Sequence, residues 1–128
     1  MADRNFLKAS FFILLVLLQA AVFAGCLGDT EQPLTLPVGA EPSAKLRNDR
    51  GIAHYQATRY QDALLQFMQA YSADKTGGEI HFNIALSFHK RGKPKQAAEH
   101  FKQAKIYAQG NEKILSSVLL NKYLKKKE

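Results

Sequence analysis

The stretch that decides the fold is "RGIAHYQATRYQDALLQFMQAYSAD", residues 50–74, because a later stretch repeats its pattern at a constant offset. The later stretch is "IALSFHKRGKPKQAAEHFKQAKIYA", residues 84–108. Internal similarity at a fixed period indicates an array of similar structural units. The small and aromatic positions of the two stretches coincide in four places: Gly51 with Ala85, Ala63 with Ala97, Phe67 with Phe101, and Ala70 with Ala104.

The spacing inside each stretch predicts a pair of helices. Ala63, Phe67 and Ala70 lie at i, i+4 and i+7, so they share one helix face. Apolar neighbours widen that face into a stripe that a helix can bury, namely Tyr60, Leu64 and Tyr71. Residues 57–59 and 91–93 read as the turns within the pairs, and Pro94 suits a first helical position, where its missing N–H costs little.

Period and spacing together resemble the tetratricopeptide repeat (TPR). The resemblance implies an all-α fold, a short α-solenoid of two TPR helix-turn-helix repeats, about residues 44–74 and 78–108. A helix at about residues 111–125 carries Ile114, Leu115, Val118 and Leu119 and reads as the capping helix that closes a repeat array. The sequence thus predicts a TPR domain over residues 44–128, and no role is assigned to Ser116 and Ser117.

Residues 1–25 resemble the signal peptide of a bacterial lipoprotein. A positive start with Arg4 and Lys8 precedes the apolar run "FFILLVLLQAAVF", and "AGC" follows it. The resemblance implies that Cys26, the only cysteine, receives a lipid and becomes the first residue of the mature chain.

Two other fates of the apolar run stay open. Phe23 stands where the lipoprotein pattern has Leu, and residues 9–27 are just long enough to cross a bilayer as an uncleaved N-terminal anchor helix. A simple secretory signal is the third possibility. In each case the rest of the chain lies outside the cytoplasm. Residues 26–43, with three prolines and two glycines, read as a flexible tether without helical or strand period.

The TPR resemblance also implies a concave groove for a partner protein, lined by the first helix of each pair. The side chains expected to face it come from both repeats and from the capping helix: Asn48, Ile52, Tyr55, Gln56, Phe82, Leu86, His89, Lys90, Leu120 and Tyr123. This mixed set suits an amphipathic helix or an extended segment. Asn83 matches one position of the clamp with which some TPR proteins hold a terminal carboxylate, but the first repeat lacks the matching residues, so that clamp is not predicted.

Catalytic and metal-binding patterns are missing from the sequence. No two of the four histidines have the i, i+4 spacing of a helical metal site, and no phosphate loop, nucleophile motif or paired-carboxylate pattern occurs. We therefore expect a protein that is not an enzyme and takes no cofactor, metal or small-molecule substrate.

Charge is concentrated in the second half of the chain. Residues 29–74 hold four basic and six acidic side chains, whereas residues 75–128 hold twelve basic and four acidic ones. The basic residues cluster at the second hairpin turn and at the tail: Lys90, Arg91, Lys93, Lys95, Lys125, Lys126 and Lys127. They indicate either an acidic partner, an anionic envelope polymer or a solvated surface. Nucleic acid is not expected, since no aromatic residues interleave the cluster.

The sequence therefore predicts a non-catalytic adaptor, tethered to a membrane and facing the periplasm, that binds a partner protein. The residue after Cys26 is not the Asp associated with inner-membrane retention, which favours the outer membrane. Two alternatives remain: an accessory subunit of an inner-membrane complex that keeps residues 9–27 as a transmembrane helix, and a basic module for an anionic envelope polymer.

Overall fold

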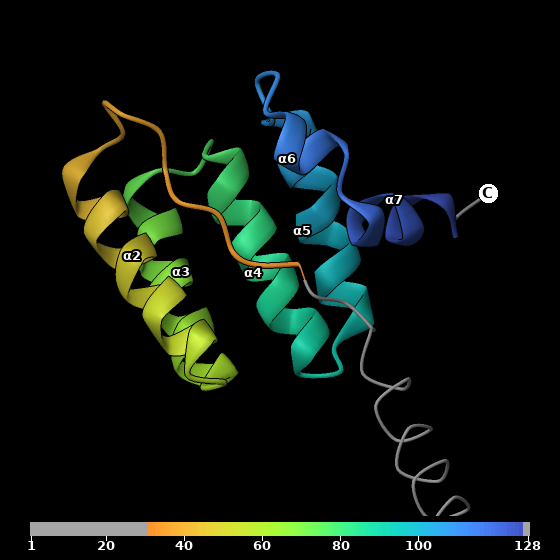
Figure 1. The fold of residues 1–128 in the computed structure, drawn as a ribbon, viewed down its shortest axis with the longest axis horizontal. Helices are drawn as coiled ribbons and strands as arrows, with labels where there is room; N and C mark the ends of the chain where they lie inside the picture. Colours follow the sequence, from red (N-terminus) through yellow and green to blue (C-terminus); the bar gives the residue numbers. More distant parts are fainter. Residues whose placement is uncertain (1–30, 127–128) are drawn as a thin grey trace, which may run out of the picture. The chain divides into compact units, whose positions relative to one another are not determined.

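In the computed structural model, which describes residues 31–126, this part of the chain forms helices and no strands (Figure 1). The helices are α2 (Pro42–Gln56), α3 (Tyr60–Ala73), α4 (Gly78–Lys90), α5 (Pro94–Ile106), α6 (Glu112–Leu115) and α7 (Val118–Lys125). The expected all-α class is confirmed. The expected signal or anchor and Cys26 lie outside the described residues, and no helix between residues 31 and 126 is long and apolar enough to cross a bilayer.

The four longer helices form two hairpins that stack on each other. Helix α2 packs against α3, α4 packs against α5, and the hairpins meet through α3 and α4. Helix α7 packs against α5, on the side away from α2 and α3 (Figure 1). Each helix therefore covers one side of the next, so the domain is a row of helices with two open ends.

The repeated small and aromatic positions are the core of both hairpins. Phe67 and Phe101 are fully buried, as are the alanines that flank them on α3 and α5. A Cβ added at Gly51 would overlap the ring of Phe67, so a glycine is needed where α2 crosses α3. This close approach explains the spacing seen in the sequence, because a larger residue at such a crossing must displace a buried ring.

The two hairpin turns place the same repeat position in the left-handed backbone region. Gly92 has φ +67° in the second turn, and Thr58, its counterpart in the first turn, has φ +60°. Glycine adopts this conformation freely, whereas a β-branched residue is strained there. Backbone strain at Thr58 therefore destabilises the turn of the first hairpin, whereas Gly92 relieves that strain in the second.

The expected capping helix over residues 111–125 is wrong as one continuous element. It is split into α6 and α7 around Ser116 and Ser117. The Ser117 hydroxyl accepts the Leu120 N–H at 3.0 Å, which starts a new helix. The break also changes which side chains are buried, because Val118 is exposed while Leu119 and Leu120 are buried.

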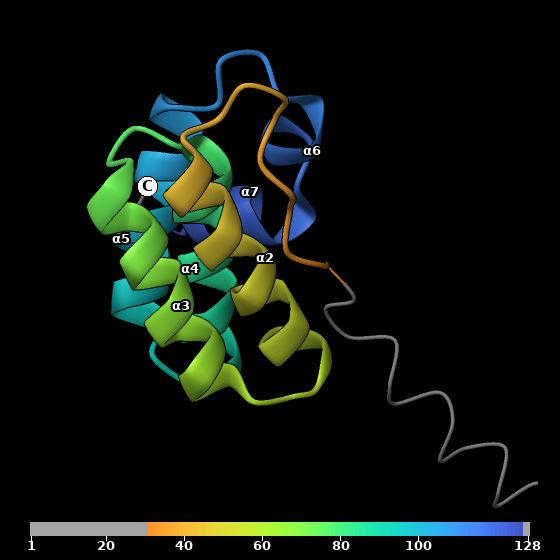
Figure 2. The ribbon, with the colours of Figure 1, turned by 90° about the vertical axis from the view of Figure 1, so that its left-hand side faces the viewer.

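Residues 31–40 differ most from the expected flexible tether. They form no helix, but they lie along the helices as an extended segment that we call the strap (orange in Figures 1 and 2). The strap ends in a turn closed by a hydrogen bond from the Ala40 N–H to the Pro37 carbonyl (3.2 Å). Helix α2 then begins at Pro42, where the Glu41 carboxylate accepts the Ala44 N–H at 2.6 Å.

Candidate functional site

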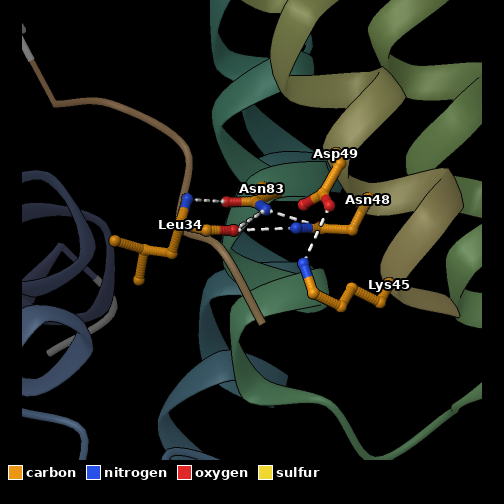
Figure 3. Close-up of polar contacts among 5 residues, drawn as sticks. All are labelled: Leu34, Lys45, Asn48, Asp49 and Asn83. Atoms are coloured by element: carbon orange, nitrogen blue, oxygen red, sulfur yellow. Dashed lines mark hydrogen bonds and ion pairs between the residues drawn. The ribbon is translucent and has the colours of Figure 1, made fainter. Parts of the chain in front are cut away.

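The backbone of Leu34 in the strap is held by two buried asparagines (Figure 3). The Leu34 N–H donates to Asn83 Oδ1 at 2.6 Å, and the Leu34 carbonyl accepts from Asn83 Nδ2 at 2.8 Å and from Asn48 Nδ2 at 2.9 Å. Asn83 Nδ2 also donates to Asn48 Oδ1 at 2.8 Å. One residue of extended chain is thus gripped through its main chain by α2 and α4 together.

This grip is stable because its polar groups are paired away from water. Asn48 and Asn83 are both fully buried, and a buried carboxamide left unpaired would cost about 1–3 kcal/mol. The nearby ion pair between Lys45 and Asp49 (2.9 Å) lies in solvent and adds little. Main-chain hydrogen bonds of this kind can hold an extended segment, and the Leu34 side chain adds apolar packing against the core.

Further contacts fix the strap on both sides of Leu34. Glu31 accepts from the Ser117 hydroxyl at 2.6 Å and from the Leu119 N–H at 3.1 Å, so its carboxylate caps the start of α7. Pro33 and Leu36 are buried, and Leu36 belongs to the hydrophobic core. The strap therefore joins three helices, α2, α4 and α7, that are far apart in the sequence.

The side chains expected to line the partner groove have different surroundings. Five are buried: Asn48, Tyr55, Phe82, Leu86 and Leu120. Three are partly buried, namely Ile52, His89 and Tyr123, and two are exposed, Gln56 and Lys90. Of this set, Asn48 contacts the strap by a hydrogen bond, while the Phe82 ring packs edge-on against Phe101 with centroids 5.7 Å apart. Half of the side chains expected to line the groove are thus buried, and one of them, Asn48, holds the chain's own strap.

Basic residues from the two sequence clusters meet at one pocket. Lys95, from the second hairpin turn, and Lys126, from the tail, both line a pocket of about 670 Å³ between α5 and α7. Lys122 on α7, which the sequence reasoning missed, also lines this pocket. The other described members of the clusters, Lys90, Arg91, Lys93 and Lys125, are exposed, and Lys127 lies outside the described residues.

A pair of histidines was also missed by the sequence reasoning. His81 on α4 and His100 on α5 are 19 residues apart, and packing of the hairpin brings their Nδ1 atoms to 3.1 Å. His81 Nε2 lies 3.0 Å from the Lys75 carbonyl, which can only accept, so His81 Nε2 carries a proton and its Nδ1 accepts from His100. The ring of Tyr107 stacks on His81, and that of Phe88 stacks on His100.

Burial keeps both imidazoles neutral. It lowers the pKa of His100 to about 4, with the neighbouring His81 acting in the same direction and Glu99 opposing it. Burial also lowers the pKa of His81, against smaller effects of the Lys75 carbonyl and Asp74. If both imidazoles were charged, both Nδ1 atoms would carry a proton and the two N–H groups would point at each other with no acceptor between them. The pair therefore holds at most one positive charge.

No protein-family model matches the chain, and no curated protein matches its sequence. Within residues 31–126, no group of three or more His, Cys, Asp or Glu side chains is placed to hold a metal ion. The features described in this part of the chain are the grip of α2 and α4 on an extended segment and a pocket lined by three lysines.

Proposed function

We propose that this chain is a non-catalytic interaction module, built from two TPR-type hairpins, that holds a partner protein outside the cytoplasm at a membrane. The grip on Leu34 is the observation that carries the proposal. A surface that pairs both main-chain groups of an extended residue is suited to binding polypeptide. The repeat assignment is supported by equivalent burial, since Ala63 and Phe67 are fully buried and so are their counterparts Ala97 and Phe101.

The membrane tether rests on the sequence of residues 1–26 alone. We propose that Cys26 carries the lipid and that residues 1–25 are removed. The intact mass of the protein extracted from its native membrane tests this, because a cleaved lipoprotein loses residues 1–25 and gains acyl chains. A full-length mass would favour the accessory-subunit alternative, in which residues 9–27 stay as a transmembrane helix. An intact mass that the C26A substitution leaves unchanged, apart from the substituted side chain itself, would rule out the lipoprotein assignment.

Crosslinking of the tethered protein in its native membrane, followed by identification of the crosslinked chain, tests the adaptor function. We expect one specific partner that binds the purified full-length protein with a defined stoichiometry. An N83A variant loses the Asn83 hydrogen bonds to Leu34, so its comparison with the wild type shows whether partner capture depends on this grip. Recovery of the protein without any partner, in membranes where it is normally made, would contradict the proposal.

A further inference from the structure

A second surface lies between α5 and α7, next to the start of α7 where Glu31 of the strap accepts the Leu119 N–H. The pocket between α5 and α7 has a volume of about 670 Å³ and a floor made of Pro94, Ala98, Leu119 and the Tyr123 ring. The Tyr123 hydroxyl lies 2.8 Å from His89 Nδ1, and its ring packs beside Phe101 with centroids 5.2 Å apart. These contacts hold the apolar wall in place, so the pocket exists before any ligand arrives.

The rim of this pocket is basic. Lys95 comes from the first turn of α5, Lys122 lies in α7, and Lys126 directly follows the last residue of α7. Within residues 31–126 none of these three lysines forms an ion pair, and no acidic side chain lines the pocket. Three like charges around one hollow repel one another and attract an anionic group.

Of the residues expected to line a groove, Asn48 holds the strap, whereas His89 and Tyr123 line this pocket. We infer that the pocket is a docking site for an acidic segment of a partner protein, which places one large apolar side chain on the floor and its carboxylates over the three lysines. The inference rests on the proposed function and names the surface and the chemistry of the partner. The charge of residues 75–128, with eight more basic than acidic side chains, would accelerate the encounter with such a segment.

The shape favours a protein segment over a lipid surface. A hollow between two helices accepts a protruding side chain, whereas a planar bilayer surface contacts only the lysine tips. The strap gives a parallel within the same molecule, because it docks through the Glu31 carboxylate and the buried Leu36 side chain. An acidic group beside an apolar anchor is therefore a chemistry that these helices already bind.

The test uses the full-length chain in detergent and a labelled probe peptide of glutamates with one central phenylalanine, at physiological ionic strength. We expect saturable binding that falls about tenfold or more in the K95E/K122E/K126E variant, since three attractive contacts become repulsive. The matched control, K102E/K105E/K113E, changes the same net charge at exposed lysines outside the pocket and should change affinity less than about twofold.

A second variant tests the apolar floor without a change of charge. Ala98→Leu fills the pocket from its half-buried floor and should weaken binding as well, while circular dichroism checks that the helices remain. Replacing the phenylalanine of the probe by alanine should have the same effect. If binding is lost equally in both triple-lysine variants, or survives the loss of the phenylalanine, the docking site is refuted.

Two further outcomes separate this inference from others. If binding to anionic lipid vesicles requires Lys95, Lys122 and Lys126 while binding of the peptide does not, the pocket is a contact site for the membrane surface and the inference is overturned. A partner that still crosslinks to the K95E/K122E/K126E variant in the native membrane would leave the adaptor function standing while removing this pocket from it.

Discussion

Acidification should destabilise the domain through the buried pair His81 and His100. Both groups have a pKa below the ordinary value of 6.5 in the folded protein, so the folded state binds fewer protons than the unfolded state as the pH falls below 6.5. The stability that the neutral pair contributes is complete above about pH 6.5. It is lost progressively as the pH falls toward about 4, where His100 takes up its proton.

The size of the effect follows from the environment of His100. The difference between its pKa of about 4 in the folded protein and the ordinary 6.5 sets the upper limit of the stability lost on acidification. Because His100 is partly exposed to solvent, we expect a smaller loss, about 1–2 kcal/mol of unfolding free energy. Asp74 opposes the lowering of the His81 pKa, and Glu99 opposes that of the His100 pKa, so neither shift is a matter of burial alone. The histidine contribution is therefore the difference between the wild type and a variant that cannot titrate.

Urea denaturation followed by circular dichroism at pH 7 and at pH 4.5 measures this difference. His100→Gln keeps a hydrogen-bond donor for His81 but has no proton to gain, so its stability should fall about 1–2 kcal/mol less than that of the wild type over this range. His54→Gln is the matched control, because His54 lies on α2, where its Nδ1 accepts from Arg59 at 3.1 Å. Equal pH dependence in the wild type and His100→Gln would refute the reasoning.

Three substitutions test other parts of the fold by the free energy of unfolding. Thr58→Gly should raise it by about 0.5–1 kcal/mol, since glycine relieves the positive φ; a decrease would show that Thr58 is not strained. Gly51→Ala should lower it by about 1–3 kcal/mol through overlap with the Phe67 ring, and an unchanged value would contradict that packing. Asn83→Ala should lower it by about 2–3 kcal/mol and expose the Leu34 amide to hydrogen exchange. Continued protection of that amide would show that Asn83 is not the group that holds Leu34.

The helices are predictable from the sequence because their signals are local. Ala63, Phe67 and Ala70 repeat at helical spacing, and the same pattern returns at Ala97, so both hairpins can be expected. The start of α7 also has a readable signal, since Ser117 precedes an apolar run as an N-cap residue does. Such signals lie within a few residues of the element that they define.

The strap and the histidine pair cannot be predicted in this way. Proline and glycine in residues 31–40 correctly indicate that no helix forms, but they carry no information about Asn83, 49 residues from Leu34. His81 and His100 meet only because two helices pack, and no spacing rule links them. The surroundings of Asn48 could not be predicted for the same reason, because it donates to the Leu34 carbonyl in a segment outside the repeat.

The strap also determines which helices bear a force applied to the chain before residue 31. A pull on the chain before residue 31 reaches the helices first through Glu31 at α7 and then through Leu34 at α2 and α4, instead of at the start of α2. The load is thus shared across the row of helices. If all of these contacts open, residues 31–40 can extend to a length of roughly 35 Å. The two asparagines, together with Glu31 and Leu36, therefore set how much chain lies free in front of α2.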